Sequence, residues 1–121
     1  MAHVKINVKV DEASIAGKLN YIIHDEQTML EIHNLLRKMC DPYVPFLEGP
    51  LSQTAEVEPH CVRYIQPYAR YQYYGVEFNH TKDYHPLATA LWDKVMLAER
   101  GDEFREAVKQ IILRRAKELY G

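Results

Sequence analysis

Strict alternation of apolar and polar side chains opens this sequence, and it constrains the fold more than any other feature. Between His3 and Val10, four aliphatic side chains fall on one side of an extended chain, and lysine and asparagine fall on the other. A period of two residues predicts a β-strand with one buried face. Because such a strand needs partner strands and a layer that covers its apolar face, the chain is expected to contain a small sheet.

Two stretches have the three-and-four spacing of amphipathic helices. The first covers about residues 25–40, where Asp25 is suited to cap the helix and Pro42 to end it. Gly101 separates a short helix that follows Pro86 from a C-terminal helix. The C-terminal helix has an acidic first turn and a basic end, which is the polarity that the helix dipole favours.

The middle of the chain predicts a β-hairpin. Apolar residues alternate in residues 51–58, and a second strand pattern covers Cys61–Gln66, with Pro59 between them. The prolines and glycine of Tyr43–Pro50 predict a turn-rich link before the hairpin. Residues 11–21 are interpreted as a loop with a helical tendency.

A tyrosine-rich segment follows the hairpin. Tyr68, Tyr71 and Tyr74 repeat every third residue before Gly75, which predicts a single helical turn. Residues 76–86 are polar and without periodicity, so they are expected to form an exposed loop. Together the patterns predict an α+β fold in a single domain, in which the N-terminal strand and the central hairpin form a small antiparallel sheet packed against the long helix and the C-terminal helix.

Composition excludes several classes of protein. A net charge of -2 provides no overall basic field for nonspecific binding to nucleic acid. Cys40 and Cys61 are not in a paired motif and no secretory segment precedes them, which predicts free thiols and synthesis inside the cell. No apolar run approaches the roughly 20 residues of a membrane-spanning helix, so the protein is expected to be soluble, with no membrane partner.

Histidines and cysteines provide weak evidence for chemistry. His80 and His85 lie in a polar loop without the further ligands of a structural zinc site, so they are interpreted as exposed loop residues. His60 and Cys61 are neighbours in a strand pattern and point to opposite faces, which argues against a thiolate–imidazolium pair. We therefore expect no catalytic group, metal or cofactor.

The tyrosine and arginine cluster permits two interpretations. Tyrosine and arginine are enriched in protein interfaces, and buried tyrosines also occur in cores. Single-stranded nucleic acid binders use the same residue types for base stacking and phosphate contact. Arg115 falls on the apolar stripe of the C-terminal helix, either as a snorkelling side chain or as a contact with a second subunit. The interface candidates are Tyr64, Tyr68, Arg70, Tyr71, Tyr73, Tyr74, Phe78, His80, Trp92 and Arg115.

The order of these motifs resembles the minor capsid, or head–tail connector and tail completion, proteins of tailed bacteriophages and prophages. The residues that match the turn of this family are Tyr43, Val44, Pro45, Gly49 and Leu51. Those that match its aromatic segment are Pro67, Tyr68, Ala69, Arg70, Tyr71, Tyr73, Tyr74 and Gly75. The start of the next helix is matched by Pro86, Leu87, Ala88 and Trp92. Glu48 and Pro50 depart from the pattern of the turn, where the family usually has Thr before the Gly and no Pro after it.

The resemblance implies a structural protein without an active site. By this resemblance, such a protein would form a ring of six copies in the virion neck between portal and tail. Its partners would be copies of itself, neighbouring portal-side or tail-side ring proteins, and DNA that passes through the channel without specific recognition. It would be made in the cytoplasm of the bacterial host. The alternatives are a single-stranded nucleic-acid-binding module and a small hydrolase or metal protein.

Overall fold

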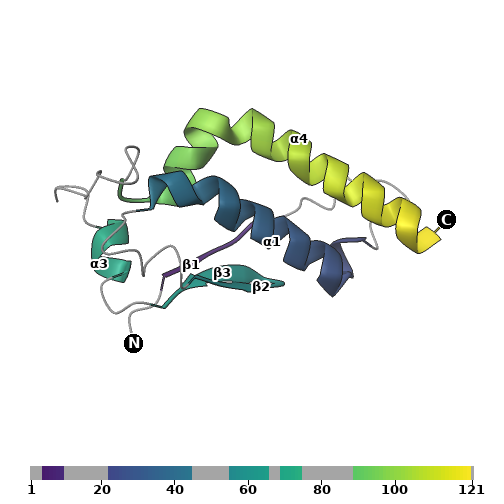
Figure 1. Ribbon diagram of the computed structural model, residues 1–121, viewed down its shortest axis with the longest axis horizontal. Helices are drawn as coiled ribbons and strands as arrows, with labels where there is room; N and C mark the ends of the chain where they lie inside the picture. Colours follow the sequence, from purple (N-terminus) through teal and green to yellow (C-terminus); the bar gives the residue numbers. More distant parts are fainter. Residues whose placement is uncertain (1–3, 10–21, 45–54, 66–68, 75–88, 121) are drawn as a thin grey trace.

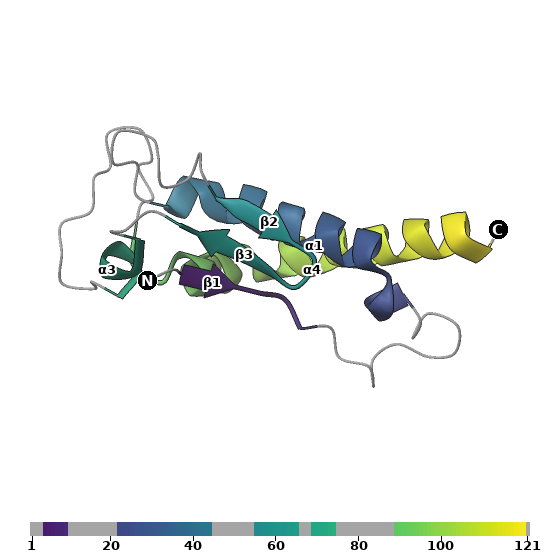
Figure 2. The same cartoon turned by 90° about the horizontal axis from the view of Figure 1, so that it is seen from below.

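The computed structural model describes residues 4–9, 22–44, 55–65, 69–74 and 89–120, and it confirms the α+β class (Figure 1). The strands are β1 (Val4–Ile6), β2 (Glu56–Glu58) and β3 (Cys61–Tyr64). The helices are α1 (Glu26–Cys40), the 3-10 turn η3 (Asp41–Tyr43), α3 (Ala69–Tyr74) and α4 (Trp92–Tyr120). Helix α1 packs on one face of the sheet, α4 lies along α1 on the side away from the sheet, and α3 lies at one end (Figures 1 and 2). No described element covers the opposite face of the sheet (Figure 2).

The sheet is antiparallel with the order β1-β3-β2. The hairpin prediction is confirmed, and the N-terminal strand pairs with the second strand of the hairpin, not with the first. Val62 of β3 lies opposite both Ile6 of β1 and Val57 of β2, so apolar side chains from all three strands share the face that meets the helices. Strand β3 is therefore the central strand, and both of its edges are paired.

Strand β1 is shorter than the alternation predicts. The alternating pattern extends to Val10, but pairing with β3 ends at Ile6. Two residues later, the Val8 amide donates a hydrogen bond to His33 Nε2 of α1 at 3.1 Å. The chain therefore leaves the sheet here, because the Val8 amide is hydrogen-bonded to a helix side chain and not to a neighbouring strand. Val10 itself lies outside the described residues.

Helix α1 has the start and the end that its sequence predicts. The Asp25 side chain accepts a hydrogen bond from the Thr28 amide at 2.9 Å, as an N-cap does. The helix ends at Cys40, and the following η3 turn contains Pro42. Its buried apolar face supplies much of the core and consists of Met29, Ile32, Leu36, Met39 and Cys40.

Helix α4 joins the two C-terminal helices of the sequence prediction across a kink. Arg100 leaves the helical region with φ -127° and ψ 21°, one residue before the predicted break at Gly101. The helix begins at Trp92, later than the predicted start after Pro86, because Leu91 has a positive φ of 47°. Beyond the kink, Phe104, Val108 and Ile112 pack into the core. The predicted loops at 11–21, 45–50 and 76–86 lie outside the described residues.

Candidate assembly surface

Three of the candidate interface residues form an aromatic cluster inside the protomer. Trp92 makes edge-on contacts with Tyr64, at a ring-centroid distance of 5.1 Å, and with Tyr73, at 4.8 Å. The exposed fractions of Tyr64, Tyr73 and Trp92 are 1%, 6% and 0%. The cluster joins β3, α3 and the start of α4 into one core. The interface prediction is therefore corrected for these three side chains, which have almost no surface to offer a neighbouring copy.

Backbone hydrogen bonds hold the same junction together. The Leu91 amide donates to the Tyr73 carbonyl at 2.8 Å, and the Thr89 amide donates to the Tyr43 carbonyl at 2.9 Å. The Tyr73 hydroxyl donates to Asp93. Burial, together with this hydrogen bond, raises the pKa of Tyr73, so its phenol stays neutral. These bonds fix the positive φ of Leu91 and the direction in which α4 leaves the core.

Helix α3 leaves one tyrosine on the surface. The exposed fraction of Tyr74 is 62%, and its ring contacts that of Tyr73 edge-on at 5.0 Å. Arg70 and Tyr71 lie on α3, but their side chains are not among those described. Tyr68, Phe78 and His80 lie outside the described residues. Tyr74 is therefore the candidate aromatic residue for which the structure supports an exposed position.

Arg115 is engaged within its own protomer. Its Nε donates to Thr28 Oγ1 at 3.2 Å, and one terminal nitrogen donates to Asp25 Oδ2 at 3.0 Å. The other terminal nitrogen donates to Glu118 at 2.8 Å. Hydrogen bonds from Thr28 and then from Arg115 lower the pKa of Asp25. Arg115 thus fastens the end of α4 to the N-cap of α1, and this network accounts for a charged residue on the apolar stripe of α4.

The uncovered face of the sheet is polar. Lys5, Arg63 and Glu56 lie in one row across the three strands, because Arg63 pairs with Lys5 on one side and with Glu56 on the other. Glu58 accepts a hydrogen bond from the Cys61 thiol at 3.0 Å and forms an ion pair with Arg63 at 3.1 Å. Partial burial, and then the hydrogen bond to Glu58, raises the pKa of Cys61, which disfavours a reactive thiolate.

A buried histidine that no sequence motif singles out joins α1 to the segment that follows β1. His33 has an exposed fraction of 0%. Its Nε2 accepts from the Val8 amide, so its Nδ1 carries the proton and donates to the Met29 carbonyl at 2.9 Å. Burial lowers its pKa, which keeps the ring neutral. The signal available in the sequence was a histidine within the apolar stripe of the first helix.

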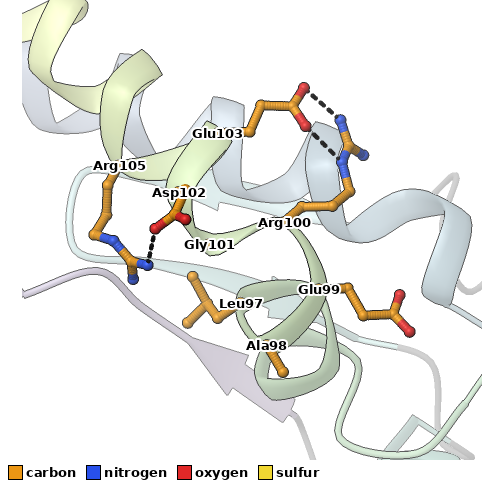
Figure 3. A pocket seen from close by; sticks show the side chains of 8 residues that line it. All are labelled: Leu97, Ala98, Glu99, Arg100, Gly101, Asp102, Glu103 and Arg105. Atoms are coloured by element: carbon orange, nitrogen blue, oxygen red, sulfur yellow. Dashed lines mark hydrogen bonds and ion pairs between the residues drawn. The ribbon is translucent and has the colours of Figure 1, made fainter.

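The kink of α4 borders an open hollow of about 320 Å³ (Figure 3). Arg100 donates to both carboxylate oxygens of Glu103, at 3.0 and 2.8 Å, and Arg105 donates to Asp102 at 2.8 Å. Both arginines of the hollow are thus paired with acidic residues of the same helix. The hollow offers no unpaired cation for an anionic ligand.

In residues 4–9, 22–44, 55–65, 69–74 and 89–120, no three histidine, cysteine or acidic side chains lie close enough together to bind a metal ion. None of the helices in that part of the chain combines the length and the apolar character needed to span a bilayer.

Comparison with known proteins provides one match. The family described as minor capsid protein matches residues 5–112, a range that contains β2, β3, α1, α3 and most of α4. No curated protein and no solved structure matches the chain. The matched range covers both the aromatic cluster and the uncovered face of the sheet.

Proposed function

Since the chain belongs to the minor capsid protein family, we propose that it is a structural component of the neck of a phage or prophage particle. The family match carries this proposal, because it covers residues 5–112 and describes a structural protein of the virion. In the neck, copies of the chain would form a ring between portal and tail. The ring would join head to tail and let DNA pass.

The proposed ring requires a heterologous interface, in which one surface of a copy meets a different surface of the next. Among the described residues, exposed Tyr74 on α3 and the polar face of the sheet support the proposal, because both are surfaces that a neighbouring copy could cover. The net charge of -2 is compatible with a channel through which DNA passes, since a strongly basic wall would bind the phosphates. Adjoining portal-side or tail-side proteins would be the further partners.

The arrangement of the aromatic residues favours the structural role over nucleic acid binding. Base stacking requires exposed aromatic rings beside basic groups. The rings of Tyr64 and Tyr73 are buried, and Arg63 forms an ion pair with Glu58. The structural role that we propose requires no catalytic group and no cofactor.

Removal of the gene from the phage or prophage tests this role. A neck protein that joins head to tail leaves two separate products when it is absent, namely heads filled with DNA and free tails. Electron microscopy of a lysate from the deletion mutant distinguishes these products from complete particles, and expression of the chain from a plasmid is the control. Complete, infectious particles in the deletion mutant would refute the proposed function.

A further inference from the structure

The two outer edges of the sheet lie on opposite sides of the protomer. Because the strand order is β1-β3-β2, the outer backbone edges of β1 and β2 are not paired with any described strand. Both strands run antiparallel to β3, so they run parallel to each other. If the sheet of one copy continued into the next with the same orientation, β2 of the first would therefore lie parallel to β1 of the second.

The two edges carry opposite charge. Glu56 is exposed on β2, and Glu58 lies two residues further along the same face. Lys5 is exposed on β1, and Lys9 is exposed just beyond it. In the part of the chain that the structure describes, none of Glu56, Lys5 and Lys9 forms an ion pair. Side chains on the same face of adjacent parallel strands lie side by side, so an acidic β2 edge complements a basic β1 edge.

A groove lies beside the acidic edge. It has a volume of about 260 Å³ and is lined by Gln27, Leu30, Glu31 and Asn34 of α1 and by Val57 of β2. Leu30 and Val57 are only partly buried there. The edge of β2 thus combines a backbone that no described strand pairs with, acidic side chains and adjacent apolar surface, which are the features that strand addition uses.

We propose that copies of this chain join edge to edge, with the β2 edge of one copy beside the β1 edge of the next. This inference rests on the proposed ring and identifies its interface. The contact is heterologous, as a ring requires, because two different edges of the same sheet meet. The edge-to-edge contact also explains why one edge is acidic and the other basic. If the charges served only to prevent aggregation at the strand edges, both edges could carry charge of the same sign.

Paired cysteines at the two edges test the contact in assembled particles. Lys5→Cys and Glu56→Cys are combined in a Cys61→Ser background, because Cys61 lies on the same face. Within one protomer the two positions are separated by β3, so their Cα atoms lie about 10 Å apart, too far for a disulfide. A disulfide can therefore form only between copies, and the expected result is a ladder of covalent multimers on a non-reducing gel. A second pair with Glu58→Cys covers the neighbouring register.

Single-cysteine variants are the matched controls. In the same Cys61→Ser background, Lys5→Cys or Glu56→Cys alone leaves one accessible thiol per copy, because Cys40 is buried, so neither can give multimers beyond a dimer. If the chain is present in complete particles but neither cysteine pair gives a ladder beyond the dimer, the edge-to-edge contact is refuted while the neck function stands. If the chain is missing from the particles, the neck function fails, and this contact fails with it.

Charge reversal provides an independent measurement. Lys5→Glu alone and Glu56→Lys alone place like charges across the contact, and each is expected to lower the yield of complete particles. The double variant restores opposite charges and is expected to restore the yield. Thermal unfolding of each purified variant shows whether it folds. Folded single variants with an unchanged yield, or a double variant with a yield no better than that of the single variants, would contradict the proposal.

Discussion

Replacement of His33 should change how stability depends on pH. The neutral imidazole accepts a hydrogen bond from the Val8 amide, 25 residues away in the sequence, and donates one to the Met29 carbonyl. Protonation of Nε2 would turn that acceptor into a donor facing another donor. His33→Gln keeps an acceptor within reach of the Val8 amide but has no group that titrates, whereas His33→Leu removes the acceptor.

The size and the direction of the effect follow from burial of the ring. The pKa of His33 is lowered from the ordinary value of 6.5 in the folded protein, so the unfolded chain binds more protons once the pH falls below about 6.5. Stability is then lost as the pH falls from this value toward the folded pKa, at a rate of at most about 1.4 kcal/mol per pH unit. His33→Leu should instead cost about 1–3 kcal/mol at neutral pH, since the Val8 amide loses its partner.

Urea unfolding, followed by circular dichroism between about pH 7.5 and 5.5, measures the free energy of unfolding at each pH. It therefore gives both the dependence of stability on pH and the cost of His33→Leu. The wild-type protein should lose stability across this range, and His33→Gln should lose less. Asn34 lies exposed on the same helix and carries no titratable group, so Asn34→Gln is the control and should keep the wild-type slope. If the His33→Gln and wild-type slopes are equal, His33 is not a neutral, buried link between α1 and the N-terminal strand.

Four further substitutions test the packing. Arg115→Met should lower the thermal midpoint at neutral pH. The deficit relative to wild type should shrink as the pH falls below about 3.8, because Asp25 then binds a proton in the unfolded chain before it does so in the folded protein, where its pKa is lowered; an unchanged midpoint at neutral pH would contradict the network. Trp92→Ala should lower the free energy of unfolding in urea by about 3–5 kcal/mol, because the indole ring is fully buried. Tyr64→Phe should cost little, because the buried hydroxyl of Tyr64 has no hydrogen-bond partner among the described residues. Gly101→Ala should be neutral or stabilising by up to about 1 kcal/mol, because the new methyl group meets only the movable end of an arginine side chain; a large loss would show that the kink requires glycine.

Local patterns were sufficient to predict most elements of the fold. Asp25 and Pro42 define the ends of α1 because capping and proline sterics act over a few residues. The β2–β3 hairpin and the short α3 helix also follow from local turn chemistry and periodicity. The strand order β1-β3-β2 was not predicted, because it depends on pairing across more than 50 residues of sequence.

The candidate site was harder to predict because core and interface use the same residue types. Tyr64, Tyr73 and Trp92 have the composition of an interface, yet they pack against one another inside the protomer. The position of Arg115 on an apolar stripe indicates a snorkelling side chain or a subunit contact, whereas its role depends on Asp25, which lies 90 residues away in the sequence. In both cases the partner is distant in the chain and cannot be identified from periodicity.

Cryo-electron microscopy of the complete particle tests the neck assignment most directly. A reconstruction of the region between portal and tail should contain a closed ring of copies of this chain around the DNA channel, each copy recognisable by the paired helices α1 and α4 over a three-stranded sheet. A neck in which no density fits this arrangement, or a particle in which the chain occupies another position, would contradict the assignment.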